Sequence, residues 1–217
     1  MGTVFDQRGS AAKSRAPRNS LDQASDRMLR VGRDLLEDRD FDQVSVKEIA
    51  DASSSSVGSF YNSFGDKDKY FSCLIEEMIK RRKAAAQNNF AQPFERLPEV
   101  LALGAIENFN KHQGIIRSAL RKHLLGIPAW APIAKMSGEF IDQYRALCGA
   151  HLGRSINASE SRRIAFAFSW LYGMLMQRVM QINDIHQSDI DQEHFARYTV
   201  RNFKRLLDDA LEPDESR

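Results

Sequence analysis

Helical periodicity is the feature that most constrains the fold of this chain. From Leu21 onward, apolar residues recur at intervals of three and four positions along most of the sequence, which places them on one face of an α-helix. No stretch alternates apolar and polar residues between turn residues, as a half-buried β-strand would. The sequence therefore predicts an all-α protein, and its 217 residues suffice for one large domain or two small ones.

Prolines, glycines and capping residues divide this pattern into separate helices. Serine, aspartate and asparagine can accept a hydrogen bond from the first helical turn, and Ser45, Ser56, Asp66 and Asn157 stand where such caps are needed. Gly114 is predicted to break the chain between two helices. The predicted helices are 22–38, a short one after Ser45, a short one from Ser56 to Gly65, 67–88, 98–111, 115–125, 133–152, 157–183 and, capped by Ser188 with Asp191, a last one to 211.

The composition changes along the chain and suggests three regions. Residues 1–20 are predicted to be a disordered basic arm, since they lack apolar periodicity and carry four basic residues against one acidic residue. Residues 21–70 are predicted to form a helix-turn-helix domain. The helix at about 67–88 would link this domain to a helical body over residues 90–217.

Two short helices joined by a three-residue turn, with a helix before and after, are typical of a helix-turn-helix. The second short helix of such a unit lies in the major groove of DNA, where small and polar side chains approach base edges. Residues 56–59 and Asn62 supply them, while Phe60 and Phe64 are spaced to anchor the helix. No residue of 53–65 is charged, so hydroxyls, backbone N–H groups and flanking lysines would contact phosphate. A packed corner of an ordinary helical protein is the alternative interpretation.

Two segments carry a resemblance to a known family, Phe41-Asp-Gln-Val-Ser-Val-Lys-Glu-Ile-Ala50 and Ser56-Val-Gly-Ser-Phe-Tyr-Asn-Ser-Phe-Gly-Asp-Lys67. Over about residues 26–72, the helix order and turn lengths resemble those of the TetR family of bacterial transcriptional regulators. The resemblance implies a three-helix DNA-binding head and an all-helical regulatory body. Residues 90–217 resemble the family only in length and helical texture.

The resemblance also implies DNA-contacting roles for individual residues. Ser45, Tyr61 and Lys67 look like residues that contact backbone phosphates. Residues 57–59 stand where the family meets base edges, and Asn62 could read an adenine edge or a phosphate. The predicted DNA-binding residues are Ser45, Lys47, Ser55, Ser56, Val57, Gly58, Ser59, Tyr61, Asn62 and Lys67.

The chain departs from the family pattern at three positions. Ser54 stands where a turn glycine is frequent, Ser55 where an apolar residue is frequent, and Asp40 where glycine is frequent. Residues 34–51 also hold seven acidic residues against two basic ones, so this face is expected to turn away from DNA.

The segment 164–176 is apolar on every face of a helix, and such a helix must be buried all round. A second subunit could bury the face that the body leaves open. Because the last two helices of the family pair with their mates as a four-helix bundle, a twofold homodimer is predicted, with a purely intramolecular core as the alternative. The predicted interface consists of Phe168, Leu171, Gly173, Leu175, Phe195, Phe203 and Leu206.

A ligand pocket in the body is implied by the resemblance. Pockets between helices are mostly apolar, although each candidate side chain could instead belong to the core. The candidates are Phe109, Leu120, Leu124, Trp130, Phe140, Tyr144, Trp170 and Tyr172, and they favour a small apolar or aromatic effector.

Two basic clusters have alternative interpretations. The run Lys80-Arg-Arg-Lys83, near the end of the fourth helix, could complement the helix dipole or contact DNA. The residues Arg117, Arg121, Lys122 and His123 could bind an acidic effector, contact the acidic first helix and so couple body to head, or face solvent.

Composition and motifs argue against other classes of protein. A net charge of +2 excludes a strongly basic nucleic-acid coat, and two cysteines suit a reducing compartment. The longest nearly apolar run, 164–176, is too short to cross a membrane. Because no metal-ligand spacing, phosphate loop or nucleophile motif is found, we expect no metal, no cofactor and no enzymatic activity.

The sequence therefore predicts a cytoplasmic, homodimeric repressor that binds palindromic double-stranded operator DNA and is released by a small effector. One alternative is a helix-turn-helix regulator, or an activator, without a small-molecule ligand. A less favoured alternative is an all-helical carrier or enzyme with a non-functional head.

Overall fold

The computed structural model describes residues 20–180 and 190–212, and within these ranges the chain is built of α-helices joined by 3-10 turns and loops. The predicted all-α class is confirmed. No helix within these ranges is long and apolar enough to cross a membrane. The helices are α1 (Ser20–Leu35), α2 (Val46–Ala52), α3 (Val57–Phe64), α4 (Lys67–Phe90), α5 (Leu97–Lys111), α6 (Gln113–Leu124), α7 (Ala131–Leu152), α8 (Ala158–Val179) and α9 (Gln192–Leu211).

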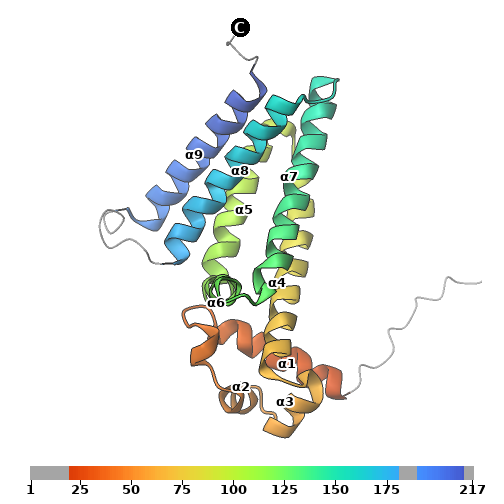
Figure 1. Cartoon of the computed structure of the whole chain (residues 1–217), viewed down its shortest axis with the longest axis vertical. Helices are drawn as coiled ribbons and strands as arrows, with labels where there is room; N and C mark the ends of the chain where they lie inside the picture. The colour runs from red at the N-terminus through yellow and green to blue at the C-terminus, as the bar shows by residue number, and fades with distance from the viewer. Residues whose placement is uncertain (1–19, 181–189, 213–217) are drawn as a thin grey trace, which may run out of the picture.

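The chain forms a small head and a long body that share one continuous helix (Figure 1). Helices α1, α2 and α3 lie together at one end of the molecule. Helix α4 begins in this head and continues into the body, where it packs against α5 and α7, and α8 and α9 lie side by side along α5. Helix α6 is seen end-on in Figure 1 and lies across the foot of the body, next to the head.

Local capping chemistry sets most of the helix starts. The predicted N-caps are confirmed at four positions, where the side chain accepts a hydrogen bond from the backbone N–H three residues later: Ser45, Ser56, Asp66 and Asn157. Asn157 closes a full capping box, because the carboxylate of Glu160 accepts from its backbone N–H at 2.7 Å. Arg154 binds the same carboxylate, and these contacts lower the pKa of Glu160 to about 2.

Several predicted boundaries differ from the structure or lie outside the described residues. Helix α1 ends at Leu35 and not at 38. Helix α9 is capped by Asp191, whose carboxylate accepts from the His194 N–H at 2.8 Å. Helix α8 ends at Val179, with Met180 as its C-cap, and not at 183. Ser188 lies outside the described residues, and so does the predicted arm, apart from its last position, where α1 begins.

The predicted break at Gly114 is wrong, and the reason lies in the head. The break is at His112, whose backbone is non-helical (φ −125°, ψ 30°), and Gly114 lies in the first turn of α6. A Cβ at Gly114 would stand 2.0 Å from the carbonyl oxygen of Arg39 and 2.5 Å from that of Leu36. Only glycine therefore lets α6 approach the head so closely, and its N–H donates to the Leu36 carbonyl at 3.1 Å.

Aromatic side chains hold the head together. Phe60 and Phe64 are buried, as predicted. Their ring centroids lie 5.0 and 4.8 Å from the ring of Tyr70 in α4. The Tyr70 hydroxyl donates to the Met28 carbonyl of α1 at 2.7 Å, so one buried tyrosine ties α1, α3 and α4 into a unit.

Most of the predicted dimer interface is instead the core of the body. Five of its seven residues are at most 5% exposed within a single chain: Phe168, Leu171, Leu175, Phe195 and Phe203. The rings of Phe168 and Phe203 pack edge to face, with centroids 5.1 Å apart. These five side chains are buried where α8 and α9 of one chain pack against each other and against α5, so they are not exposed for contact with a second subunit. Gly173 is exposed and Leu206 is half-buried, so these two remain candidates.

Candidate nucleic-acid interface

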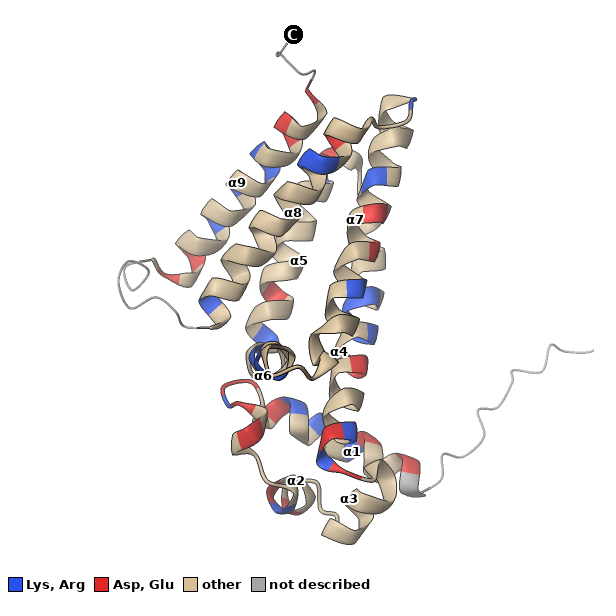
Figure 2. Ribbon diagram, viewed as in Figure 1, with Lys and Arg blue, Asp and Glu red and all other residues tan. Residues whose placement is uncertain are grey.

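Helix α3 offers an uncharged face at the end of the head farthest from the body (Figures 1 and 2). Its inner side is fixed by the two phenylalanine anchors, so the other side is left open. The predicted base-reading residues and the predicted phosphate contact of this helix are exposed or half-buried on that open side: Val57, Gly58, Ser59 and Asn62, and Tyr61. Val57 is 40% exposed and Tyr61 is 48% exposed, so both side chains are accessible to a molecule outside the chain.

No contact within the described part of the chain requires the glycine at position 58. An added Cβ would meet only the Ser56 hydroxyl, 3.7 Å away. Glycine within a helix costs about 0.5–1 kcal/mol relative to alanine. Its presence in α3 therefore favours an external surface that approaches this helix closely.

The serine-rich turn between α2 and α3 adopts a geometry that glycine normally supplies. Ser54 has a φ of 53°, in the left-handed region. The Ser55 N–H donates to the Ala50 carbonyl at 2.9 Å, and the Ser53 hydroxyl donates to the same carbonyl at 3.0 Å. Arg27 of α1 donates to the Ser53 carbonyl at 3.4 Å. Polar contacts thus preserve the turn although Ser54 stands where the family often has glycine.

The residues predicted to contact phosphate differ in their surroundings. Ser45 is exposed and its oxygen accepts from the Glu48 N–H, so its own proton stays available to donate. Lys47 is exposed and pairs with Asp51 at 2.7 Å, a kind of contact that contributes little and exchanges readily. The ammonium group of Lys67, at the start of α4, lies 4.6 Å from the centre of the Phe41 ring.

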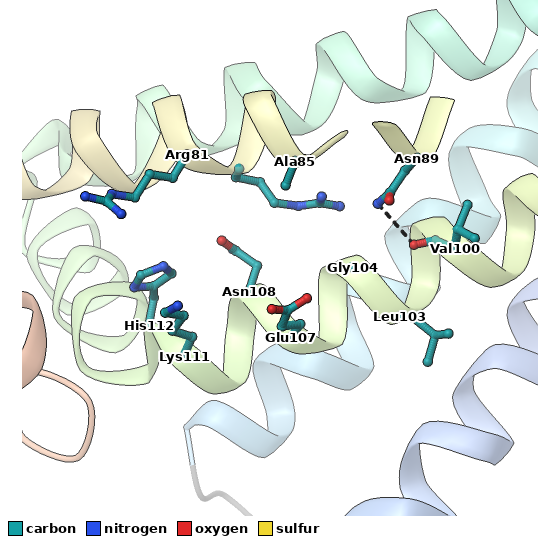
Figure 3. Close-up of a pocket in the computed structure, with 11 residues that line it drawn as sticks. Arg81, Ala85, Asn89, Val100, Leu103, Gly104, Glu107, Asn108, Lys111 and His112 are labelled. Carbon is teal, nitrogen blue, oxygen red and sulfur yellow. Dashed lines mark hydrogen bonds between the residues drawn. The ribbon is translucent and has the colours of Figure 1, made fainter. Parts of the chain in front are cut away.

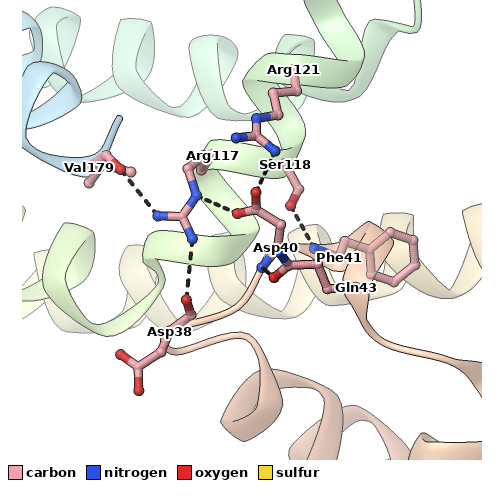
Figure 4. Close-up of polar contacts among 8 residues, drawn as sticks. All are labelled: Asp38, Asp40, Phe41, Gln43, Arg117, Ser118, Arg121 and Val179. Atoms are coloured by element: carbon pink, nitrogen blue, oxygen red, sulfur yellow. Dashed lines mark hydrogen bonds and ion pairs between the residues drawn. The ribbon is translucent and has the colours of Figure 1, made fainter. Parts of the chain in front are cut away.

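Asp40 joins the head to the body. It lies in the loop between α1 and α2, is only 6% exposed, and its carboxylate binds the guanidinium groups of Arg117 and Arg121 of α6 (Figure 4). Arg117 also donates to the main-chain carbonyls of Asp38, at 3.4 Å, and Val179, at 3.2 Å. The basic cluster of α6 therefore does contact the head, as one of its interpretations expected. The contacts are with Asp40 and a main-chain carbonyl of the loop after α1, and not with acidic side chains of α1.

Further contacts connect α6 to the predicted DNA-binding side of the head. The Ser118 hydroxyl accepts from the Phe41 N–H at 2.9 Å. Lys122 pairs with Asp68 of α4 at 2.8 Å, and its ammonium group lies 5.7 Å from the Phe41 ring. Since Lys67 contacts the same ring, a single phenylalanine connects α6 with a predicted phosphate contact.

The cavity between α4 and α5 is not the aromatic pocket that the sequence predicts. A cavity of about 390 Å³ lies between α4 and α5 (Figure 3), and polar side chains dominate its lining, among them Arg81, Arg82, Asn89, Glu107, Lys111 and His112. None of the predicted residues lines it: Phe109, Leu120, Leu124, Trp130, Phe140, Tyr144, Trp170 and Tyr172. Phe109, Phe140 and Tyr144 are buried in the core, and Leu124 is 73% exposed.

The sequence analysis missed Arg82 and His112 as candidate site residues. Arg82 belongs to a basic run that we assigned to the helix dipole or to DNA. In the structure α4 continues to Phe90, so Arg82 lies well before the end of the helix. Its side chain is buried. No signal in the sequence showed that α5 would cover it.

The head matches a family in sequence. Residues 28–72 match the family model described as bacterial regulatory proteins, tetR family. The match covers the second half of α1, all of α2 and α3, and the start of α4. No curated protein matches the chain.

Solved structures share the fold of most of the chain at low sequence identity. A tetR-family transcriptional regulator from Streptomyces coelicolor is 15% identical, with a TM-score of 0.64, over 87% of this chain and 82% of its own. The TetR-family transcriptional regulator PfmR from Thermus thermophilus is 18% identical, with a TM-score of 0.56, over 86% of this chain and 100% of its own. The superantigen PfiT is 15% identical, with a TM-score of 0.58, over 85% of this chain and 97% of its own.

At these identities the structural likeness shows the fold alone, and PfiT illustrates that proteins with different descriptions share it. The sequence match is confined to residues 28–72, and it includes α3 with its exposed face. The head of the chain, residues 28–72, therefore matches the TetR family in sequence, and the described helices share the fold of solved TetR-family structures.

Proposed function

We propose that this protein is a ligand-responsive transcriptional repressor that binds palindromic operator DNA as a homodimer. The exposed, uncharged face of α3, within the segment that matches the family, carries the proposal. A helix of this size fits the major groove, and small side chains such as Gly58 and Ser59 let it approach the base edges. Tyr61 and Lys67 would flank it as phosphate contacts, with residues 21–70 as the DNA-binding domain and 90–217 as the regulatory one.

A second copy of the chain would cover the outer face of α8 and α9. Phe166 is 63% exposed and Tyr198 is 46% exposed, and Trp170 is half-buried. An added Cβ at Gly173 would meet nothing within 4 Å. Large exposed apolar side chains beside an open glycine suit close packing of two helix pairs about a twofold axis. Such a dimer would present two α3 helices roughly 34–36 Å apart, one turn of DNA.

The response to a ligand would pass through α6. Lys111 and His112, which line the cavity, stand directly before this helix. A ligand that shifts the start of α6 would displace Arg117, and with it the loop at Asp40 and the ring of Phe41. Ligand binding would favour a head arrangement that misfits the operator, and the DNA-bound protein would bind the ligand less tightly by the same factor. The cavity favours this interpretation over a regulator without a ligand.

Selection of genomic DNA fragments by the purified protein, near physiological salt and with non-specific competitor DNA, tests the proposal. We expect enrichment of a palindrome whose half-sites lie about 10 base pairs apart. Ser59→Ala and Asn62→Ala should alter the selected sequence more than the overall affinity. A folded, dimeric protein that enriches no palindrome would contradict the proposal.

A further inference from the structure

Arg82 is a buried cation that forms no ion pair with any residue the structure describes. Its side chain extends from the middle of α4 and is 7% exposed. The ring of Phe140, whose centroid lies 5.2 Å away, contacts its guanidinium group. Burial lowers the pKa of Arg82, although the longer-range influence of Tyr172 and Glu107 opposes this shift. A buried charge is normally paired, since leaving it unpaired costs several kcal/mol.

The cavity beside Arg82 has a second unsatisfied group. His112 is 4% exposed, and its buried Nδ1 has no hydrogen-bond partner in the described part of the chain. Burial, and then the nearby charges of Lys111, Arg33 and Arg81, lower the pKa of His112 to about 4. The ring is therefore neutral at neutral pH and can present either a donor or an acceptor to the cavity.

A glycine of α5 lets the side chains of α4 lie close to α5 beside the cavity. A Cβ at Gly104 would stand 2.6 Å from the Asn89 amide nitrogen and 3.2 Å from an Arg82 nitrogen, so both side chains pack directly against this glycine. Asn89 is already held by a hydrogen bond from its side-chain N–H to the Val100 carbonyl at 3.2 Å (Figure 3). A larger residue at 104 would displace Asn89 and Arg82, so glycine preserves the position of the buried guanidinium group at the cavity.

The charges around the cavity are mostly positive. Arg81 and Lys111 are exposed and line it together with Arg82, and Glu107 is the only carboxylate among the described residues of the lining. Arg81 is partly neutralised by Glu77, one turn earlier, at 2.5 Å. Figure 3 shows the Glu107 carboxylate pointing into the space between α4 and α5. The lining thus offers a cationic group in the interior and one acceptor on the opposite helix.

We propose that this cavity binds the carboxylate or phosphate group of a small organic anion, with Arg82 as its charge partner and His112 as a hydrogen-bonding partner. Glu107 would accept a hydrogen bond from a hydroxyl or ammonium group of the same molecule. A volume of about 390 Å³ suits a metabolite-sized ligand. The site is independent of DNA, and only the assignment of the anion as the effector rests on the proposed function. This ligand class differs from the apolar effector that the sequence favours.

The first test needs no ligand and separates a binding role from a structural one. Arg82→Met keeps the length of the side chain and removes its charge. If Arg82 is unpaired until an anion binds, the ligand-free variant should melt about 2–4 °C higher than the wild type, because a buried unpaired charge is removed. Lys80→Met, on the exposed side of the same helix, is the matched control and should melt like the wild type. A lower melting temperature for Arg82→Met would show a structural arginine and overturn the proposal.

The second test measures anion binding directly. Inorganic phosphate and succinate, each compared with sodium chloride at equal ionic strength, should distinguish a phosphate site from a carboxylate site. We expect at least one of them to raise the melting temperature of the wild type and of Lys80→Met, and neither to raise that of Arg82→Met. His112→Gln should reduce the shift. No shift in the wild type, or an equal shift in Arg82→Met, would overturn the proposal. Since DNA is absent from the assay, its outcome is independent of operator binding.

Discussion

Asp40 and Arg117 lie 77 residues apart in the sequence and form an ion pair whose two side chains are each only 9% exposed. One residue belongs to the head and the other to the body. The free-energy cost of transferring two charges out of water is offset only when the geometry of the ion pair is good and further hydrogen bonds satisfy the remaining polar groups. Arg117 meets this condition, because it also donates to two main-chain carbonyls. The junction between head and body is therefore a specific contact.

Removal of the Asp40 charge should destabilise the protein strongly. Asp40→Asn leaves the buried Arg117 without its carboxylate, and the expected loss is about 3–5 kcal/mol in the free energy of unfolding. Urea denaturation followed by circular dichroism measures it. Asp42→Asn, two residues along on an exposed position, should change the stability by less than about 0.5 kcal/mol. Equal effects of the two substitutions would show that the buried pair is not what holds the junction.

Replacement of Ser54 by glycine should stabilise the head. A non-glycine residue in the left-handed region costs about 1–2 kcal/mol, and glycine relieves this strain. Part of the gain in stability is offset by the greater conformational freedom of glycine in the unfolded chain. We expect Ser54→Gly to raise the free energy of unfolding by about 0.5–1 kcal/mol. Ser54→Ala keeps the strain and should bring no gain. The urea midpoints of both variants check this, and a destabilised Ser54→Gly would be inconsistent with a strained turn.

Substitutions at Lys67 and Tyr61 should weaken DNA binding in different ways. Lys67→Ala removes a charge, so the slope of log affinity against log salt should fall by about 1 for each head that loses a phosphate contact. Tyr61→Phe removes only a hydroxyl and should weaken binding with the slope unchanged. Lys80→Ala, farther along α4, is the control for a change in net charge. Fluorescence anisotropy at several salt concentrations gives the slopes, and identical slopes in all three variants would refute the placement of Lys67.

A charge on the outer face of α8 should separate the two subunits. Phe166→Asp places a carboxylate in the proposed interface. In the dimer this carboxylate would be buried close to the same carboxylate of the second subunit and left unpaired. Sedimentation velocity should show dimers for the wild type and monomers for this variant. Leu125→Asp changes an apolar residue that is 80% exposed elsewhere on the body, and it should leave the dimer intact. A dimeric Phe166→Asp would move the interface away from this face.

The sequence predicted the helices well where their limits depend on neighbouring residues. The caps at Ser45, Ser56, Asp66 and Asn157 were correct, because capping is an interaction within four residues. The break assigned to Gly114 was wrong. Glycine is needed there because the carbonyl groups of Leu36 and Arg39, far away in the sequence, leave no space for a side chain.

The sequence could not reveal which side of a helix its neighbours cover. The run 164–176 was correctly identified as unusually apolar, but α9 buries Phe168 and Leu171 while Phe166 stays exposed. Arg82 belongs to the basic run assigned to the helix dipole or to DNA, and its burial was visible only in the structure. Asp40 stood out as a departure from the family, yet its partners in α6 were visible only in the structure.

The most direct test of DNA recognition by α3 compares two glycines that have open space beside them. Gly58 lies on the proposed recognition face and Gly138 on α7, where an added Cβ would meet nothing within 4 Å. Leucine at either position should leave the fold intact, so the readout is the ratio of affinities for the selected operator and a scrambled duplex near physiological salt. The wild type and Gly138→Leu should bind the operator at least about 10³-fold more tightly, whereas Gly58→Leu should lose this preference. An operator preference that survives in Gly58→Leu would contradict the account.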